Sequence, residues 1–310
     1  MEEENGVCMT YSIVPYTDRP DWLAKRRQGL GASDVAAVMG VSPWSTPRQC
    51  WLSKVEPDAP EPMSNEDMEW GLTMEAAILN EATKRLGADI VLPGPLLRND
   101  ERPWMMATPD ALCEVRVLSE MVIVEAKKVD AWNWEEIPPY YLMQVQWQMA
   151  VTGYQKAYVA ALHRGRRLEL YPVEADEEVQ AELIEAGGRF WTLVESVEPP
   201  PVEAADNDYL AGLWPDHVEA AVEVPEELAA EMRTAKESLA IAKENLDFLS
   251  AQVKDLMGTA DTAVVGQQVV ATWRTQTRTR FDVKALRAED PDIADTYTKS
   301  GTSRVFRIKT

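Results

Sequence analysis

Residues 121–128, Met-Val-Ile-Val-Glu-Ala-Lys-Lys, constrain the fold more than any other stretch of the chain. The alternation of a β-strand would put Glu125 and Lys127 on one face, after two apolar residues, and three further apolar side chains on the other. A carboxylate and an ammonium would then point into the same space at the end of a buried strand. Since folding does not require this arrangement, it indicates either a structural ion pair or a functional site.

A second carboxylate precedes another predicted strand. The turn Thr-Pro-Asp, 108–110, comes directly before the run Ala-Leu-Cys-Glu-Val-Arg-Val. If the two strands are neighbours, Asp110 and Glu125 lie together with Lys127. Two carboxylates and a lysine suit a hard divalent cation, which prefers oxygen ligands. Such an ion can polarise a phosphate and lower the pKa of a bound water, while a lysine can orient that water or stabilise developing charge.

Two arginines and a glycine-rich turn precede a predicted helix near the N-terminus, in residues 26–51. Gly29 and Gly31 allow the backbone to approach a ligand closely. Ser33 or Asp34 can cap a helix that begins at Val35, and the backbone amides at such a helix start suit a phosphate. An ordinary capped helix that binds nothing is the alternative interpretation of these residues.

Two further predicted helices carry polar side chains beside apolar stripes. Residues 68–87 have apolar side chains at helical spacing, with Glu75 next to the stripe. Residues 140–153 form the second helix, in which Gln144 and Gln148 lie one turn apart. A solvated glutamate and amides that only pack or contact solvent are the competing interpretations.

Taken in this order, these segments resemble the PD-(D/E)xK nuclease superfamily and, within it, the lambda-exonuclease-like branch that is also called the YqaJ viral recombinase family. Pro-Asp at 109–110 and, after 14 intervening residues, Glu-Ala-Lys at 125–127 match the superfamily motif. The arginine-glycine-serine segment, the Gly-x-x-x-Glu at 71–75, the glutamine-containing helix and a hairpin followed by a helix support the narrower family. The resemblance covers roughly residues 20–200.

The resemblance implies a fold and a catalytic centre. The fold is α/β, with an α+β mixed sheet of the restriction-endonuclease-like PD-(D/E)xK type flanked by helices. Asp110 and Glu125 would hold Mg²⁺ or Mn²⁺, and Glu75 would support them directly or through water. Lys127 would orient or activate the attacking water.

The same resemblance implies roles for residues around that centre. Gln144 would help to position the metal-bound water, with Gln146 as a second candidate. Phosphate binding maps onto Ser33 and onto Arg26 or Arg27, because the adjacent arginines leave the register open.

The implied function is a metal-dependent deoxyribonuclease, namely a 5′-to-3′ exonuclease that acts on double-stranded DNA ends in phage recombination. It would leave a 3′ single strand for a single-strand annealing recombinase. An endonuclease or flap nuclease on the same core, and a catalytically inert DNA-binding or scaffold module, are the alternatives. Family members often close into rings that line a channel with basic residues, so the resemblance also implies a homo-oligomer.

Net charge bears on this function because phosphate binding depends on Lys and Arg, and the chain has a formal net charge of −21. Much of the excess lies in residues 174–231, which hold 17 acidic residues and one arginine. Basic groups occur at 25–27, at 163–167 and within 273–310. An acidic chain of this kind can still have a basic groove.

The cysteines and the hydropathy limit the protein class. Cys8, Cys50 and Cys113 are widely separated, without a Cys-x-x-Cys pair or a Cys/His cluster, which argues against disulfides, structural zinc and iron–sulfur clusters. No run of 18 apolar residues occurs, and residues 1–20 lack the order of a signal peptide. We therefore expect a cytoplasmic protein, in the bacterial host if it is phage-encoded, with no membrane partner.

Composition predicts three parts of the chain. Residues 1–200 form the nuclease core, the acidic and proline-containing residues 201–224 form a linker, and residues 225–310 form an extension. The extension begins with a sustained heptad pattern, which predicts a long helix that either packs on its own domain or self-associates as a coiled coil. Predicted strands at 267–277 and 303–309, with a short helix between them, make the rest a small β-rich region.

Overall fold

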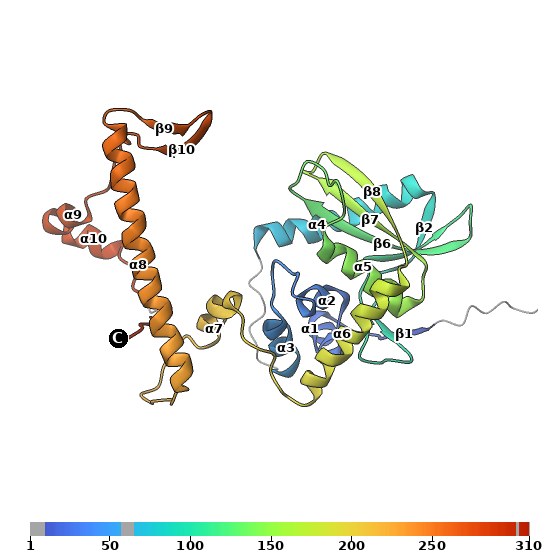
Figure 1. The fold of residues 1–310 in the computed structure, drawn as a ribbon. Helices are drawn as coiled ribbons and strands as arrows, with labels where there is room; N and C mark the ends of the chain where they lie inside the picture. The colour runs from blue at the N-terminus through green and yellow to red at the C-terminus, as the bar shows by residue number, and fades with distance from the viewer. Residues whose placement is uncertain (1–9, 57–64, 302–303, 310) are drawn as a thin grey trace, which may run out of the picture. The chain divides into compact units, whose positions relative to one another are not determined.

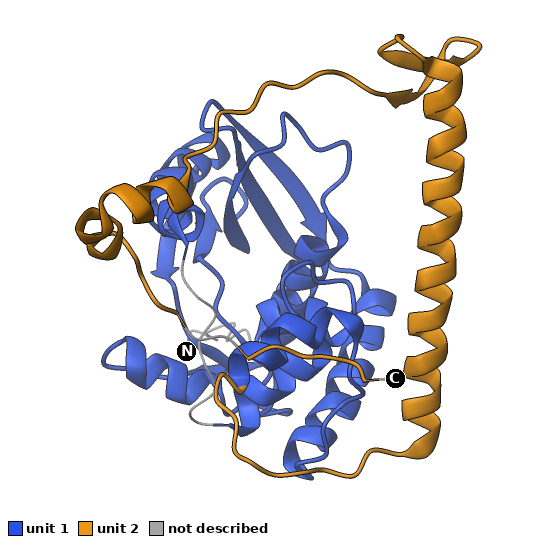
Figure 2. Ribbon diagram, turned by 90° about the vertical axis from the view of Figure 1, so that its left-hand side faces the viewer, with its two compact units in different colours: residues 1–213 blue, residues 214–310 orange. Residues whose placement is uncertain are grey.

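The computed structural model describes residues 10–56, 65–301 and 304–309. The chain divides into two compact units, residues 1–213 and residues 214–310, which are coloured separately in Figure 2. The division into a core, a linker and an extension, predicted from composition, stays a prediction. Cys8 lies outside the described residues, whereas Cys50 and Cys113 are buried free thiols.

A five-stranded mixed sheet forms the centre of unit 1 (Figure 1). Its strands lie in the order β2 (Ala88–Pro93), β5 (Ala111–Val115), β6 (Glu120–Val129), β7 (Lys156–His163) and β8 (Arg167–Glu174). Strands β6 and β7 run parallel because helix α5 (Pro139–Thr152) carries the chain from the end of one to the start of the other. The predicted mixed α/β fold is confirmed.

Helices bury both faces of strand β6. Ile123 belongs to a core shared with α2 (Ala32–Val38), α3 (Pro47–Val55), α5 and α6 (Glu177–Glu195), while Val122 and Val124 pack with α4 (Glu66–Leu86). The apolar alternation of β6 therefore serves two cores, one on each side of the sheet. The remaining elements of unit 1 are β1 (Tyr11–Ile13), β3 (Leu97–Asn99) and β4 (Met106–Ala107), which form a small second sheet, with α1 (Arg19–Arg26), η1 (Ala204–Asp206) and α7 (Asn207–Leu213).

Helix α2 begins three residues earlier than its sequence suggested. We expected Ser33 or Asp34 to cap a helix that begins at Val35, but the helix begins at Ala32 with Gly31 as its N-cap. Asp34 lies inside the first turn and accepts a hydrogen bond from the Gly31 N–H at 2.9 Å. A carboxylate at the third helical position can thus satisfy the cap from within the helix, so the expected start was wrong.

Unit 2 contains the long helix α8 (Glu226–Met257), which confirms the helix predicted from the heptads. Strands β9 (Thr262–Val265) and β10 (Gln268–Thr272) form a hairpin, and α9 (Val283–Glu289) and α10 (Pro291–Thr296) follow. The strand predicted at 303–309 is wrong for its described residues, since 304–309 pair with no other strand. The Ile308 carbonyl instead accepts a hydrogen bond from the Lys236 ammonium at 3.1 Å. None of the described helices is long and apolar enough to cross a membrane.

Candidate active site

The pairing of β5 with β6 brings two of the predicted carboxylates together. The strands are antiparallel with Ala111 opposite Val124, so Asp110, just before β5, lies level with Glu125. Asp110 Oδ2 accepts a hydrogen bond from the Ala126 N–H at 2.7 Å, which fixes this carboxylate against β6. Because the register of a strand pair determines which side chains face each other, the two carboxylates are placed by the sheet itself.

Glu125 is the most enclosed member of this group, with a side chain that is only 2% exposed. Its Oε1 accepts hydrogen bonds from Lys127 Nζ, at 2.8 Å, and from Gln144 Nε2. Its Oε2 accepts a hydrogen bond from Gln148 Nε2 at 2.9 Å. A buried carboxylate is costly unless it is paired and hydrogen-bonded, and here both oxygens have donors.

The glutamines of α5 divide between two environments. Gln144 and Gln148 face Glu125, whereas Gln146 donates to the Glu174 carbonyl at 2.8 Å and accepts from the Asp176 N–H at 3.0 Å. The structure therefore places the second candidate, Gln146, away from the carboxylates. The sequence analysis placed Gln148 one helical turn from Gln144 but gave it no role in the site, although that spacing puts both amides on one side of the helix.

Carboxylates crowd one another in this group. Burial and the neighbouring charge of Glu125 raise the pKa of Asp110 well above its ordinary value, and the same two causes raise the pKa of Glu75. Burial acts to lower the pKa of Lys127, but the charges of Glu125 and Asp110 outweigh it, so that pKa is raised. Lys127 therefore stays protonated at neutral pH, and the carboxyl groups around it outnumber it.

A separate group contains the predicted phosphate-binding residues. The Arg26 guanidinium donates hydrogen bonds to Ser33 Oγ and, at 3.3 Å, to Asp34 Oδ1, and it lies 5.1 Å from the Trp22 ring centroid. Asp34 also accepts a hydrogen bond from Lys54 Nζ at 2.6 Å. Burial alone would raise the pKa of Asp34, but the charges of Lys54 and Arg26 lower it to about 2. Here positive charge exceeds negative charge.

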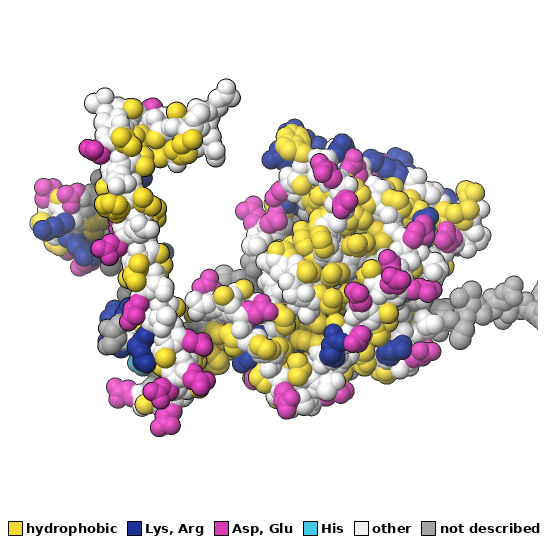
Figure 3. Space-filling model, viewed as in Figure 1, with side chains coloured by type: hydrophobic (Ala, Val, Ile, Leu, Met, Phe, Trp, Pro, Cys, Tyr) yellow, Lys and Arg dark blue, Asp and Glu magenta, His cyan; other side chains and the backbone are white. Residues whose placement is uncertain are grey.

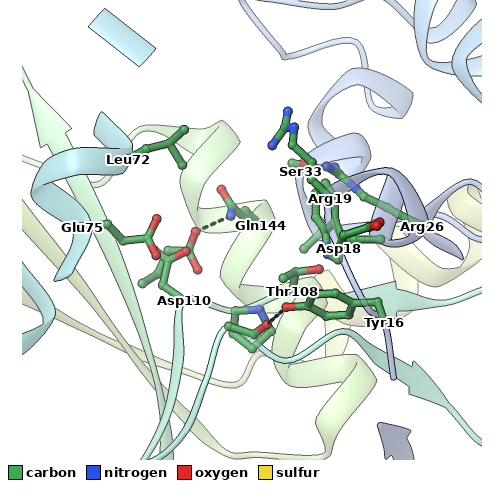
Figure 4. A pocket seen from close by; sticks show the side chains of 16 residues that line it. Tyr16, Asp18, Arg19, Arg26, Ser33, Leu72, Glu75, Thr108, Asp110 and Gln144 are labelled. Atoms are coloured by element: carbon green, nitrogen blue, oxygen red, sulfur yellow. Dashed lines mark hydrogen bonds between the residues drawn. The ribbon is translucent and has the colours of Figure 1, made fainter. Parts of the chain in front are cut away.

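One cavity of about 530 Å³ connects the two groups. Figure 4 shows Glu75 and Asp110 on one side of it and Arg26 and Ser33 on the other. The cavity is also lined by Glu125 and Gln144, by Gly31, Thr108 and Pro109 of the predicted segments, and by residues that the sequence did not single out, namely Tyr16, Asp18, Arg19, Trp22, Ala32, Leu72 and Gly94. Arg27 lies at the C-cap of α1 and is not among the lining residues, so of the two adjacent arginines only Arg26 reaches the cavity.

Comparison with known proteins agrees with this arrangement, since residues 21–155 match the model of the YqaJ-like viral recombinase domain. Over these residues the sequence is similar to that family. The family predicted from the motifs is thereby confirmed. The uncharacterized protein YqaJ of Bacillus subtilis (strain 168) is 29% identical over 308 residues, which cover 94% of each chain.

A solved structure shares the fold of much of this chain. The alkaline exonuclease LHK-Exo from Laribacter hongkongensis, in complex with dAMP, matches with a TM-score of 0.50 and 20% identity, over 63% of this chain and 97% of that one. Another crystal structure of that exonuclease has a TM-score of 0.49 and 20% identity, over 58% and 94% of the two chains. At this identity the likeness concerns the fold alone.

The donor set of the YqaJ-like domain fits a hard divalent cation in its chemistry. Carboxylates are the ligands that Mg²⁺ and Mn²⁺ prefer, and a cation would relieve the repulsion that raises the pKa values of Asp110 and Glu75. Within the described ranges, however, no group of three His, Cys, Asp or Glu side chains is arranged as a finished set of ligands. Glu125 Oε1 already accepts two hydrogen bonds, whereas Oε2 accepts one and keeps a lone-pair site for a cation.

Proposed function

We propose that the YqaJ-like domain is a metal-dependent deoxyribonuclease that hydrolyses phosphodiester bonds. A single observation carries the proposal: one cavity has crowded carboxylates on one wall and, opposite them, the guanidinium of Arg26 beside Ser33. The first wall suits a divalent cation and the second a phosphate, and a nuclease must bring these two together. The recombinase family of the domain and the exonuclease fold of its structural neighbour support this function.

In this proposal Asp110 and Glu125 hold Mg²⁺ or Mn²⁺, and Glu75 supports them. The bound ion would polarise the phosphate and lower the pKa of a water. Lys127 is protonated, so it acts as a hydrogen-bond donor that orients the water and stabilises developing charge, not as a base. Gln144, which lines the cavity beside Glu125, orients that water as well.

On the opposite wall, Arg26 and Ser33 bind a phosphate of the substrate. The guanidinium is already fixed by Asp34 and by the Trp22 ring, so it loses little conformational freedom on binding. The place of Arg27 outside the cavity lining supports the register in which Arg26 is the phosphate ligand.

For the substrate, we infer 5′-to-3′ digestion of double-stranded DNA ends in phage recombination, with a homo-oligomeric ring and a single-strand annealing recombinase as partner. The family of the domain supports a recombination role, and the structural neighbour is named an exonuclease. A ring that turns basic surfaces inward would reconcile DNA binding with a net charge of −21.

One experiment tests this function. Linear duplex labelled at its 5′ ends or at its 3′ ends, and covalently closed circular DNA, are incubated with and without Mg²⁺ or Mn²⁺. We expect loss of the 5′ label from linear DNA only when metal is present, while the circle survives. Cutting of the circle would support the endonuclease or flap-nuclease alternative. DNA binding without metal-dependent cleavage of either substrate would support the inert binding module and contradict the proposal.

A further inference from the structure

The turn between β7 and β8 concentrates positive charge outside the cavity. Arg164, Arg166 and Arg167 are all exposed around Gly165, in a chain with a net charge of −21. Figure 3 shows Lys and Arg side chains gathered along the upper edge of unit 1, where Figure 1 places the ends of β7 and β8. The proposed phosphate ligands, Arg26 and Ser33, lie on α1 and α2. The turn is therefore a separate basic surface.

A loop that follows β6 packs against the turn and adds an exposed aromatic ring. The Arg164 guanidinium lies 4.3 Å from the ring centroid of Trp132, which is 66% exposed, and Arg164 Nε donates to the Asp130 carbonyl at 3.0 Å. Arg167 donates to the Trp132 carbonyl at 3.2 Å and also pairs with Glu169. The ring and the carbonyl orient the charge of Arg164 without neutralising it.

The sheet fixes the place of this surface relative to the candidate active site. Strands β6 and β7 are parallel with Lys127 opposite Ala161, so Arg164 lies three residues further in the same direction. At the rise of a β-strand this is about 10 Å, or roughly three nucleotide steps along one strand of a duplex. Trp134 of the same loop contacts the Tyr141 ring at 5.6 Å, and that ring lies 4.9 Å from Lys127 Nζ.

We propose that Trp132 and Arg164, with Arg166 beside them, form a DNA-binding platform that holds the substrate about three nucleotides from the cleaved phosphate. The inference rests on the proposed function of the cavity and adds a second contact region for the same substrate. A guanidinium binds phosphate oxygens with two donors, and an indole offers a flat surface to a sugar or an unpaired base. Because Arg164 is already stacked and hydrogen-bonded, its ordering costs little when DNA binds.

The test compares Arg164→Glu and Trp132→Ala with a matched control, Arg116→Glu. Arg116 follows β5, at the opposite end of the sheet from Lys127, and its Nε donates to the Gly87 carbonyl at 3.1 Å. Arg116 also pairs with Asp89 at 3.5 Å, so the control makes the same charge change at another exposed, hydrogen-bonded arginine away from the site. Binding of a labelled short duplex is measured by fluorescence anisotropy over a series of salt concentrations, without metal, in an Asp110→Asn background that prevents cleavage.

We expect Arg164→Glu to weaken binding about tenfold or more and to reduce the slope of log affinity against log salt by about 0.9 for each phosphate that the variant no longer neutralises. Trp132→Ala should weaken binding with little change of that slope, and Arg116→Glu should match the background. Unchanged binding by Arg164→Glu, or an equally weakened binding by Arg116→Glu, overturns the platform. If Arg164→Glu lowers the thermal unfolding midpoint, Arg166→Glu on the exposed turn takes its place.

The outcomes separate the platform from the proposed function. If the wild type cleaves DNA but Arg164→Glu binds duplex normally, the platform is wrong and the nuclease stands. If Arg164→Glu and Trp132→Ala weaken DNA binding while the wild type shows no metal-dependent cleavage, the platform stands and the nuclease fails. Binding of polyglutamate, as a probe for acidic proteins, is measured on the same variants. If Arg164→Glu loses polyglutamate binding but binds duplex normally, the surface binds acidic proteins and the platform is overturned.

Discussion

Two lysine–carboxylate pairs lie at or next to residues that line the same cavity, since Glu125 lines it and Asp34 is hydrogen-bonded to Arg26, and the pairs differ in what surrounds them. Lys54 and Asp34 are 2.6 Å apart, and Lys127 and Glu125 are 2.8 Å apart, so their geometry is nearly the same. The first pair includes a carboxylate whose pKa falls to about 2, whereas the second stands beside Asp110, whose pKa rises well above its ordinary value. Distance alone does not distinguish an ion pair that holds the fold from one that belongs to a site.

The surplus charge around each pair makes the distinction. Asp34 faces two cations, Lys54 and Arg26, while Lys127 is the cation among three carboxylates that influence one another. Opposite surpluses on the two walls of one cavity suit a metal ion and a phosphate that must meet there. We call Lys54 with Asp34 the helix pair and Lys127 with Glu125 the strand pair. The comparison predicts that the helix pair contributes mainly to stability and the strand pair mainly to catalysis.

The largest expected effect is on turnover. Lys127→Ala should reduce the rate of DNA hydrolysis by about 10³-fold or more, which corresponds to about 4 kcal/mol of lost transition-state stabilisation, because the donor beside the water is removed. Degradation of labelled linear duplex measures it, and circular dichroism checks the fold. Lys128→Ala is the matched control, since the next residue points to the other face of β6 and pairs with Asp67. Equal rates for Lys127→Ala and wild type would refute the site.

A smaller effect is expected on folding when the helix pair is broken. Lys54 is 3% exposed, and Lys54→Ala leaves Asp34 without its main cation, so the free energy of unfolding should fall by about 3 kcal/mol. Urea denaturation provides the measurement. Lys84→Ala serves as the control, because Lys84 and Glu81 form an exposed pair that should contribute less than about 0.5 kcal/mol. A similar small change in both variants would show that the buried pair does not support the fold.

The sequence predicted the carboxylates around the strand pair better than it predicted the helix pair, and there is a physical reason for this. Asp110 and Glu125 follow from the alternation of β6 and from an antiparallel neighbour, which are both local patterns. The pair of Lys54 with Asp34 joins α3 to α2, and nothing in the sequence of either helix specifies that crossing. Contacts set by packing between helices cannot be read from the periodicity of one helix.

The same reason accounts for the other misses. Gln148 lies on the predicted helix, but only the rotation of α5 against β6 shows that it reaches Glu125. The choice between Arg26 and Arg27 depends on which side of α1 faces the cavity, which adjacent positions do not reveal. The segment 304–309 has the apolar character of a strand, yet strand formation requires a partner backbone that the described part of unit 2 does not supply.

The next largest expected effect is the stabilisation of the folded protein by a bound metal ion, which can be measured without any cleavage of DNA. If Asp110 and Glu125, supported by Glu75, bind Mg²⁺ or Mn²⁺ in the folded state, metal at about 100 times its dissociation constant should stabilise the protein by about 2.7 kcal/mol. The thermal unfolding midpoint with and without metal is the measurement. Asp110→Asn should show a much smaller shift, while Asp34→Asn should retain it. An equal shift in wild type and Asp110→Asn would place the ion elsewhere.

The smallest expected effect is on the pH dependence of stability, to which Asp34 and Asp110 should contribute with opposite signs. The pKa of Asp34 is about 2 in the folded protein against 3.8 ordinarily, so its ionised form contributes about 2 kcal/mol of stability above pH 3.8, which is lost as the pH falls toward 2. Asp110 has a raised pKa, so the folded protein binds its proton more tightly than the unfolded chain does. Its contribution is present below the ordinary value and is lost as the pH rises through the raised pKa.

Urea denaturation at a series of pH values without metal separates these contributions. Asp34→Asn should flatten the acid limb of the stability profile, and Asp110→Asn should flatten the limb toward neutral pH and raise stability there. A loss of stability in Asp110→Asn at neutral pH would mean that the charge of Asp110 is compensated by Lys127 and the Ala126 N–H alone. The strand group would then be a second structural ion pair, with no surplus of charge that calls for a cation.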